Sequence, residues 1–422
     1  MATSDGRYPA LDFLKTLPLW DGTRFSPLEV PRRLLALLGN PQDRVPAVHV
    51  GGTNGKGSTC AYLAAMLRAS GANVGQFVSP HLTHVTERCL LNGLPCPVQT
   101  FNDAVQEVID LTEREGLPAS YFVLGAVATF LVFARAELDW MVIEVGLGGT
   151  FDATNTMKVP RACVVTSIGM DHMDWLGTSL AEIAENKAGI ARRDVPLFVG
   201  HLPQEALKAV RWSARRIGAP LELPKDDGAI SELTTDIAVP YLRQNAKLAA
   251  QVALALGLPL DAVRRGIRTA RWPGRAERVV LRCATGVDRE VLLDAAHNPD
   301  GVDVLVDHLE TLSVTFSRFV IVVGMLSRKD WQGMAERLRA FGSRHEVTWI
   351  VSPIDSHLSL APRTLCELLP NAAVAVSAAD ALAQAVAAAD ENTLIVVAGS
   401  IYLLGEVRPL VTEEPFRSIV EL

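Results

Sequence analysis

A glycine-rich segment with one lysine follows a short apolar run early in the chain. Residues 45–50 are the apolar run, and residues 58–68 have the amphipathic pattern of a helix. A strand, a glycine turn and a helix N-terminus together make a cradle for phosphate. Backbone N–H groups converge on the anion there, and Lys56 adds a full positive charge. The predicted phosphate contacts are Gly52, Thr53, Asn54, Gly55, Lys56, Gly57 and Ser58.

This segment is a variant of the common phosphate loop. Val50 stands where a glycine usually precedes the Gly-Lys pair by five residues, and Gly57 stands where Ser or Thr usually follows the lysine. The simpler alternative is a glycine turn that caps a helix and carries a solvated lysine. We favour the phosphate loop because strand, turn and helix follow one another in the required order.

Polar side chains follow three further predicted strands. Glu144 ends a buried strand, Ser79 ends the strand before it, and Asp171-His172 follows the next one. Ligands of open α/β sheets bind beyond the carboxyl ends of the strands. Magnesium takes few protein oxygens and completes its octahedron with water and phosphate, so Glu144 and Ser79 are candidate metal ligands. The alternatives are a carboxylate that caps a turn, an ordinary hydroxyl and a surface histidine.

Four other segments are chemically suggestive but have ordinary structural explanations. Residues 146–149 contain three glycines, which indicates either close approach to a ligand or a tight turn. Lys187 lies in a helical pattern and is by default a solvated lysine. Residues 294–299 and Gly399-Ser400 each follow a strand, as either a polar site loop or a common turn and cap.

The order of apolar runs predicts an α/β protein with a doubly wound, mostly parallel sheet. The first series of strands is predicted at residues 45–50, 73–79, 139–145, 161–167 and 195–199. The second series is predicted at residues 291–294, 318–323, 346–351, 372–376 and 393–397. Trp272-Pro-Gly-Arg275 is the best linker between them, because proline and glycine end the preceding element. We therefore predict domains at residues 1–275 and 276–422, with a shared site between them.

Bulk composition narrows the class of protein. The chain has 422 residues, too many for one core, and a formal net charge of −7, which argues against general nucleic-acid binding. Six scattered cysteines without a CxxC pair indicate reduced thiols in a cytoplasmic protein. No apolar run has membrane-spanning length, and the N-terminus lacks a signal core.

Together these motifs resemble the folylpolyglutamate synthase / dihydrofolate synthase family, within the ATP-dependent Mur-type amide ligases. The similarity extends over nearly the whole chain. It is carried by residues 38–42, 49–58, 79–82, 144–149, 152–155, 171–172, 175–177, 187–190, 272–275 and 294–299, and by Gly399-Ser400, Gly405 and Arg408.

The resemblance implies a two-domain ligase that phosphorylates a carboxylate with ATP and then lets the amine of L-glutamate displace phosphate. It implies a P-loop N-terminal domain and a Rossmann-like C-terminal domain that closes over ATP. Ser79 and Glu144 would hold one Mg²⁺, and Glu144 and His172 a second. Asn245 would meet adenine, and Arg275, Asp294 and His297 would complete the nucleotide site. Lys187 aligns with a lysine that family members carry as a carbamate, and Lys56, His172 and Lys187 are the implied catalytic residues.

The residues expected to contact the acceptor match the family pattern less closely than the nucleotide and metal residues do. Phe122 remains for stacking on a pterin, with Asp152 and Ala153 as further pterin or folate contacts. Val123 replaces an acid, Thr86 departs from an Asn-Glu-Arg pattern, and Thr150 replaces an arginine.

The acceptor could therefore be dihydropteroate, a reduced folate or another acid. A Mur-like ligase for a different amine or acid is one alternative, and a non-catalytic nucleotide-binding homologue is another. A plain P-loop kinase or GTPase does not explain the second domain. The resemblance also implies a monomer.

Overall fold

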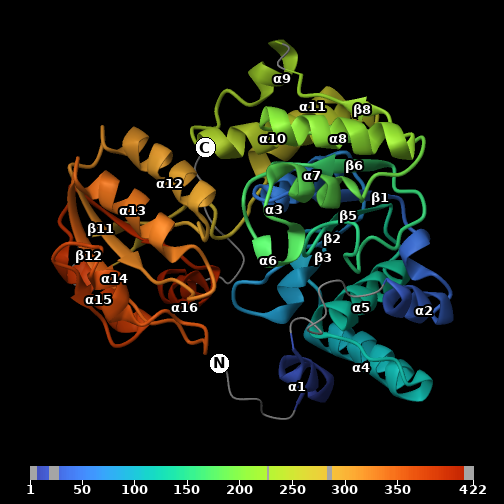
Figure 1. Ribbon diagram of the computed structural model, residues 1–422, viewed down its shortest axis with the longest axis horizontal. Coiled ribbons are helices and arrows are strands. Elements are labelled where there is room, and N and C mark those ends of the chain that lie inside the picture. Colours follow the sequence, from blue (N-terminus) through green and yellow to red (C-terminus); the bar gives the residue numbers. More distant parts are fainter. Residues whose placement is uncertain (1–6, 19–27, 226–227, 283–287, 413–422) are drawn as a thin grey trace. The chain divides into compact units, whose positions relative to one another are not determined.

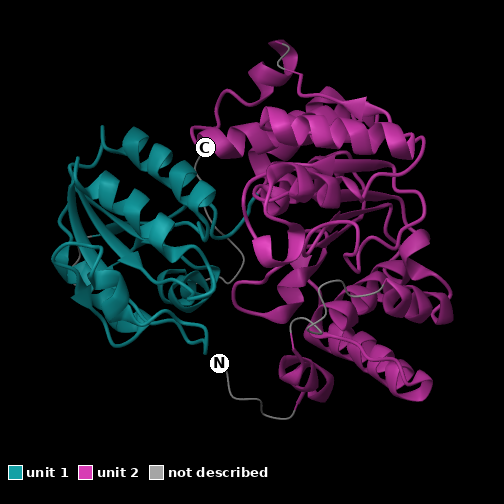
Figure 2. Ribbon diagram, in the orientation of Figure 1, with its two compact units in different colours: residues 1, 271–422 teal, residues 2–270 magenta. Residues whose placement is uncertain are grey.

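The computed structural model describes residues 7–18, 28–225, 228–282 and 288–412. The chain divides into two compact units, Ala2–Ala270 and Arg271–Leu422, each described by itself (Figure 2). The Trp272–Arg275 segment, predicted as a linker, therefore lies at the start of the second unit.

The first unit is built on an eight-stranded sheet in the order β4-β3-β2-β5-β1-β6-β7-β8 (Figure 1). The strands from β2 to β8 in this order are parallel, whereas β3 and β4 form an antiparallel edge. The strands are β1 (Ala47–Gly51), β2 (Val74–Phe77), β3 (Cys89–Leu91), β4 (Leu94–Pro95), β5 (Trp140–Glu144), β6 (Ala162–Val165), β7 (Leu197–Val199) and β8 (Leu221–Glu222).

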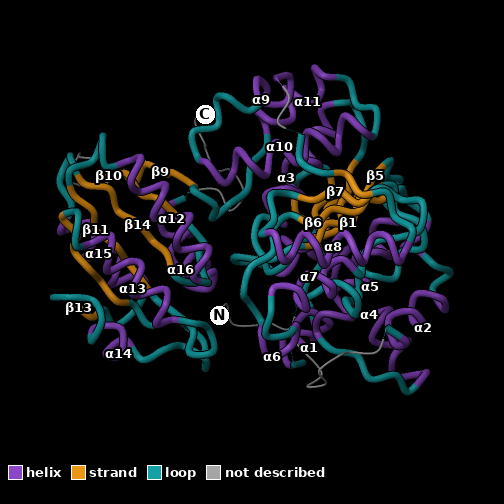
Figure 3. Tube along the Cα trace, turned by 45° about the horizontal axis from the view of Figure 1, so that its top comes forward, coloured by secondary structure: helices purple, strands orange, loops and turns teal. Residues whose placement is uncertain are grey.

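Helices cover both faces of this sheet (Figure 3). They are α1 (Pro9–Thr16), α2 (Glu29–Leu37), α3 (Lys56–Ala69), α4 (Val98–Glu115), α5 (Tyr121–Arg135), α6 (Met173–Leu176), α7 (Leu180–Ala188), α8 (Gln204–Ile217), α9 (Gly228–Leu233), α10 (Pro240–Ala255) and α11 (Leu260–Thr269), with 3₁₀ turns at Pro41–Asp43 and Val85–Arg88. Helices α10 and α11 pack on α3, which lies on β1, β2 and β5. Gly266 is needed in that layer, because a Cβ there would lie 2.4 Å from the Met66 Cα.

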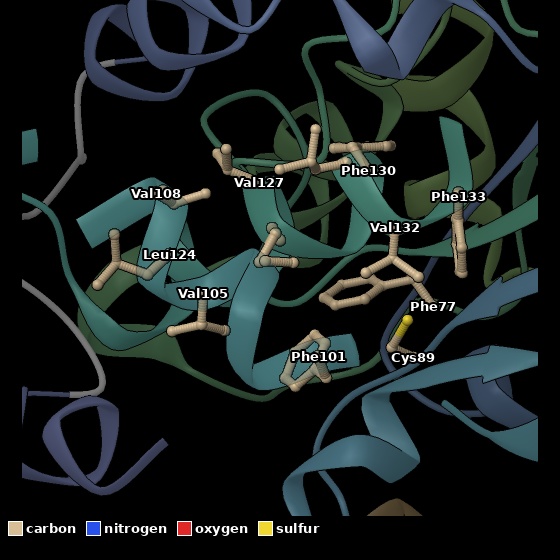
Figure 4. Packing of buried hydrophobic residues seen from close by; sticks show 14 of the residues in the cluster. Phe77, Cys89, Phe101, Val105, Val108, Leu124, Val127, Phe130, Val132 and Phe133 are labelled. Atoms are coloured by element: carbon tan, nitrogen blue, oxygen red, sulfur yellow. The ribbon is translucent and has the colours of Figure 1, made fainter. Parts of the chain in front are cut away.

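The opposite face carries two apolar clusters. One joins α1, α2, α4 and α5 to β1, β2 and β5, and Figure 4 shows Phe101, Val105 and Phe130 packed within it. The other joins α7 and α8 to β6 and β7. Alternate residues of each central strand face the two helix layers, which explains why these strands are apolar throughout.

The second unit has a six-stranded sheet in the order β13-β12-β11-β14-β10-β9, parallel except for β9. Its strands are β9 (Glu277–Leu281), β10 (Arg289–Leu293), β11 (Arg318–Val323), β12 (Glu346–Val351), β13 (Ala373–Val374) and β14 (Thr393–Ala398). Its helices are α12 (Pro299–Leu312), α13 (Trp331–Gly342), α14 (Pro362–Cys366), α15 (Ala378–Ala388) and α16 (Ile401–Val411). The predicted α/β class with two mainly parallel sheets is confirmed.

Each of the ten predicted strands is found, with ends shifted by at most a few residues. Strands β3, β4, β8 and β9 were not predicted. Within the described residues, no helix is both long enough and apolar enough to cross a membrane. The five cysteines that the structure describes are free thiols, and Cys283 lies outside the described residues.

Candidate nucleotide and metal site

The glycine-rich segment connects the end of β1 to the start of α3 and requires glycine at two positions. Gly52 has a φ of +139°, and a Cβ there would lie 2.0 Å from the Thr166 Oγ1. Gly55 has a φ of +83° and caps α3, and a Cβ there would lie 2.5 Å from the Asn245 Oδ1. Both the backbone conformation and the close neighbours exclude other side chains. Asn245, predicted to meet adenine, lies on α10 against this loop.

The loop is held by the segment that follows β6. The Thr53 N–H donates to the Ser167 carbonyl at 2.8 Å, and the Asn54 N–H donates to the Ser167 hydroxyl at 2.9 Å. The Gly169 N–H donates to the Thr53 hydroxyl at 3.0 Å. These bonds fix the backbone that would face an anion. The sequence did not identify Ser167 and Gly169, although polar residues directly after a buried strand were the available signal.

Lys56 is the first residue of α3, so its charge lies at the positive end of a 14-residue helix. Its Nζ donates to the Thr53 carbonyl at 3.1 Å. The first N–H groups of a helix have no partner within the helix and point outward from its end. The geometry therefore supplies converging N–H groups and an ammonium group, which is what a polyphosphate requires.

Glu144 lies beside the phosphate loop because β5 and β1 are neighbours. Glu144 pairs in register with Val50, two residues before Gly52, and its side chain is only 3% exposed. The Ser79 N–H donates to the Glu144 Oε2 at 3.1 Å, which brings the end of β2 to the same place. A carboxylate and a hydroxyl are hard oxygen donors, so this pair fits a magnesium-class ion.

Asp171 and His172 follow β6 and precede α6. His172 has a left-handed φ of +53°, and its Nε2 lies 3.8 Å from the Asp171 Oδ2. In the described part of the chain, no three His, Cys, Asp or Glu side chains form a group able to hold a metal ion by themselves. A metal at Glu144 would therefore need oxygens from phosphate or water, as is usual for Mg²⁺.

Lys187 is buried against the phosphate loop. The residue is 4% exposed, and its Nζ donates to the Gly52 carbonyl at 2.9 Å. Burial, reinforced by the charge of Lys56, lowers the pKa of Lys187 to about 7, although Asp171 and Asp152 act in the opposite direction. The neutral amine is therefore far more populated at pH 7 than in an exposed lysine. The default interpretation of a solvated lysine does not describe it.

Asp152 organises the glycine loop that follows Glu144. Its carboxylate accepts from the Leu147 N–H at 2.8 Å, the Thr154 N–H at 2.9 Å and the Thr154 hydroxyl at 2.5 Å. It is 1% exposed, and burial raises its pKa. Ala153, beside it, is also buried. Both residues lie within the loop core, so a pterin contact here would be made by loop backbone more readily than by the Asp152 side chain.

Phe122 lies under the same loop. A Cβ at Gly146 would lie 2.2 Å from the Phe122 ring, and Phe77 packs edge-on with a centroid distance of 6.0 Å. The three positions that depart from the family pattern have structural partners. Val123 is buried in the apolar cluster, and Thr86 and Thr150 are hydrogen-bonded to His84 and to the Asn186 carbonyl.

In the second unit, Asp294 follows β10 and fixes two turns. Its carboxylate accepts from the Ala276 N–H and the Ala296 N–H, both at 2.9 Å. Arg275 and His297 both contact the Ala295 carbonyl, at 3.0 and 2.8 Å. Arg275, Asp294 and His297 are thus brought together at the carboxyl end of β10.

Within the first unit, the structure brings Lys56, Ser79, Glu144, Lys187 and Asn245 around the loop 52–58. His172 stands on the segment after β6, and Phe122 lies beneath the loop 146–152.

Two protein-family models match separate parts of this chain. The Mur ligase middle domain family matches residues 50–196, and the dihydrofolate synthetase C-terminal domain family matches residues 277–410. The dihydrofolate synthase/folylpolyglutamate synthase of Bacillus subtilis (strain 168) is 32% identical over 415 residues, which covers 89% of this chain and 93% of that protein.

Solved structures extend the similarity to the whole fold. E. coli FolC in complex with DHPP and ADP has a TM-score of 0.83 and 30% identity, and covers 97% of this chain and 99% of its own. A bifunctional folylpolyglutamate synthase/dihydrofolate synthase with Mn, AMPPNP and L-glutamate bound has a TM-score of 0.80 and 29% identity, and covers 95% of this chain and 96% of its own. The chain therefore belongs to the folylpolyglutamate synthase / dihydrofolate synthase family of ATP-dependent Mur-type ligases.

Proposed function

We propose that this protein joins L-glutamate to the carboxylate of a pterin or folate, using ATP and passing through an acyl phosphate. The observation that carries the proposal is the register of β1 with β5. It puts the buried Glu144 carboxylate beside the loop that ends in Lys56. A phosphate cradle next to a metal-binding carboxylate is the arrangement that phosphoryl transfer requires.

In this proposal the loop residues Gly52 to Ser58 and Lys56 bind the β- and γ-phosphates. Asn245, Arg275, Asp294 and His297 complete the nucleotide contacts. Ser79 and Glu144 hold one Mg²⁺, and Glu144 and His172 hold a second. When bound, the metal ions neutralise charge on the phosphates. Lys56 and the loop N–H groups stabilise the negative charge that develops on the transferring group.

The proposed reaction has two steps. An acceptor carboxylate oxygen bonds to the γ-phosphorus while the bond to the ADP oxygen breaks, which gives ADP and an acyl phosphate. The neutral amine of glutamate then attacks the acyl carbon, phosphate leaves with one acceptor oxygen, and the amine loses a proton. Exclusion of water until glutamate attacks protects the acyl phosphate from hydrolysis.

We propose that Lys187 acts as a carbamate. CO₂ reacts only with the neutral amine, and the lowered pKa of about 7 provides it at neutral pH. Carbamylation replaces a cation with an anion close to Lys56 and, in this proposal, to the metal site. The change removes the like-charge conflict between the two lysines.

Labelling with ¹³C-bicarbonate should give a carbamate carbon signal that the Lys187→Arg variant lacks. At fixed bicarbonate the signal follows the neutral amine, so it should rise as pH increases, with its midpoint near pH 7. A midpoint near pH 10, as for an exposed lysine, or an equal signal from Lys187→Arg would rule out the proposal. Arginine is the matched variant because it keeps the positive charge and does not deprotonate.

The proposed acceptor is a pterin or folate carboxylate. Phe122 and the loop at Asp152 and Ala153 are our proposed pterin contacts. Val123, Thr86 and Thr150 depart from the family pattern on this side, and they favour one second candidate, a Mur-like ligase that uses a different acid.

An acceptor series tests the function. ADP release should be measured with ATP, Mg²⁺ and L-glutamate, using dihydropteroate, tetrahydrofolate or no acceptor. Turnover with dihydropteroate indicates dihydrofolate synthase activity, and turnover with tetrahydrofolate indicates folylpolyglutamate synthase activity. Nucleotide binding without turnover on either acceptor would contradict the proposal and favour the second candidate or a non-catalytic homologue.

We further propose a monomeric, cytoplasmic protein. The free thiols among the described cysteines support a reducing compartment.

A further inference from the structure

A fully buried histidine of β1, His49, contacts the segment that follows β5. Its Nε2 lies 2.8 Å from the hydroxyl of Thr154, which is also fully buried. Thr154 comes directly after the glycine loop at residues 146–152, and β1 leads into the phosphate loop. This contact therefore ties the strand before the phosphate loop to the loop that Asp152 organises.

The direction of each hydrogen bond between His49, Thr154 and Asp152 follows from the protons available. The Thr154 hydroxyl has one proton and donates it to the Asp152 Oδ1 at 2.5 Å. Its oxygen can only accept from His49, so the imidazole carries its proton on Nε2. Burial and the charge of Arg192 lower the pKa of His49 to about 3, so the ring is neutral at pH 7.

The other ring nitrogen of His49, Nδ1, then has a lone pair and no proton. Among the residues that the structure describes, this buried atom has no hydrogen-bond partner. An apolar side chain could fill the same space without burying an unpaired acceptor, which is unfavourable. The Nε2–H bond to Thr154 is therefore the interaction that histidine adds at this position.

The hydrogen bonds end on the carboxylate that fixes the glycine loop. Asp152 also accepts from an N–H of that loop at 2.8 Å. A Cβ at Gly146 would lie 2.2 Å from the Phe122 ring. A Cβ at Gly149 would lie 2.8 Å from the Lys187 carbonyl oxygen. A shift of Asp152 would therefore move backbone that lies against both the proposed pterin contact and the proposed carbamate.

We propose that His49 is a positioning residue for the ligase reaction. As the Nε2–H tautomer it orients the Thr154 hydroxyl toward Asp152, and Asp152 holds the loop 146–152 in place for the acceptor. The proposal rests on the proposed function, because this loop and Phe122 are the proposed acceptor contacts. His49 acts only through Thr154 and Asp152.

NMR of the full chain with ¹⁵N-labelled histidine tests the hydrogen bonds without any substrate. The spectrum of His49→Gln identifies the His49 signals by their absence. We expect a neutral ring with its proton on Nε2 and with shifts that stay constant from about pH 5 to pH 8. A ring that titrates in this range, or a proton on Nδ1, would overturn the proposal.

Two amide substitutions separate the hydrogen bond from the packing. His49→Gln places an N–H donor at the position of Nε2 and should keep the bond to Thr154, whereas the shorter amide of His49→Asn cannot reach it. The Leu147 and Thr154 amides donate to Asp152. By mass spectrometry, hydrogen exchange of the peptide that contains them should be about 3- to 10-fold faster in His49→Asn, the effect of one hydrogen bond. His49→Gln should exchange at the wild-type rate, and equal exchange in the two variants would contradict the positioning role.

Kinetics separate this role from the proposed function. In His49→Asn, KM for the pterin acceptor should rise about 3- to 10-fold, while kcat and KM for ATP stay within about 2-fold of the wild type. Equal rises in KM for ATP and for the acceptor would indicate a general loss of structure and overturn the positioning role. If the wild type ligates no acceptor, the proposed function fails, and the exchange and NMR results still decide the role of His49.

Discussion

Replacing Glu144 by glutamine should lower ligase turnover by at least about 100-fold. The substitution is isosteric, and the glutamine carbonyl can still accept the Ser79 N–H. The substitution removes the negative charge of a residue that is only 3% exposed. In the pairing of β5 with β1, Glu144 lies opposite Val50, two residues before Gly52 of the phosphate loop. The loss should therefore appear in catalysis and metal affinity, with the fold unchanged.

Initial rates of ADP release, together with Mn²⁺ binding by the ATP complex, measure this effect. Glu107→Gln is the control, because Glu107 is exposed and pairs with Arg135 on the surface. Its rate should match the wild type. Full activity of Glu144→Gln with unchanged Mn²⁺ affinity would remove Glu144 from the metal site.

Breaking the buried ion pair of the second unit should cost about 3–5 kcal/mol of stability. The Arg408 and Glu277 side chains are 1% and 0% exposed, and the Arg408 Nη2 lies 2.9 Å from the Glu277 Oε1. Glu277 also accepts the Gly274 N–H at 2.7 Å, so it anchors the segment that carries Arg275. Arg408→Met leaves an unpaired buried carboxylate, which is the costly state.

Hydrogen exchange of the β10 and β14 peptides, followed by mass spectrometry, measures that loss in the full chain. The control is Arg278→Met, which breaks the exposed Arg278–Glu290 pair on neighbouring strands and should cost less than about 1 kcal/mol. If Arg408→Met left the exchange of both strands unchanged, the pair would have no anchoring role. Replacing both partners, with Glu277→Leu, should recover much of the loss.

Much of the fold could be predicted because the central strands are buried on both faces. Residues 318–323 form a nearly continuous apolar run that is buried from Phe319 onward, and this strand was predicted to the residue. The missed strands β4 and β8 have only two residues each and lie at sheet edges, where no apolar run marks them. Strand β9 is half exposed and antiparallel.

The sequence predicts those residues of the site that belong to recognisable motifs. Lys56 and Ser79 follow buried strands and Glu144 ends one, so the topology alone brings them together. The bonds that hold them join residues far apart in the chain, such as Lys187 to Gly52 and Arg408 to Glu277, and no local pattern specifies such partners. Asp152 shows the same limit. The sequence shows an acid in a glycine-rich loop. Only the fold shows that the Asp152 carboxylate already accepts hydrogen bonds from N–H groups of that loop.

In the proposed reaction, ATP phosphorylates the acceptor carboxylate before the glutamate amine attacks it. Dihydropteroate labelled with ¹⁸O in its carboxyl group tests this most directly, with the released phosphate analysed by mass spectrometry. Transfer through an acyl phosphate should place one ¹⁸O atom in each released phosphate for every amide formed. Amide formation with unlabelled phosphate would contradict it.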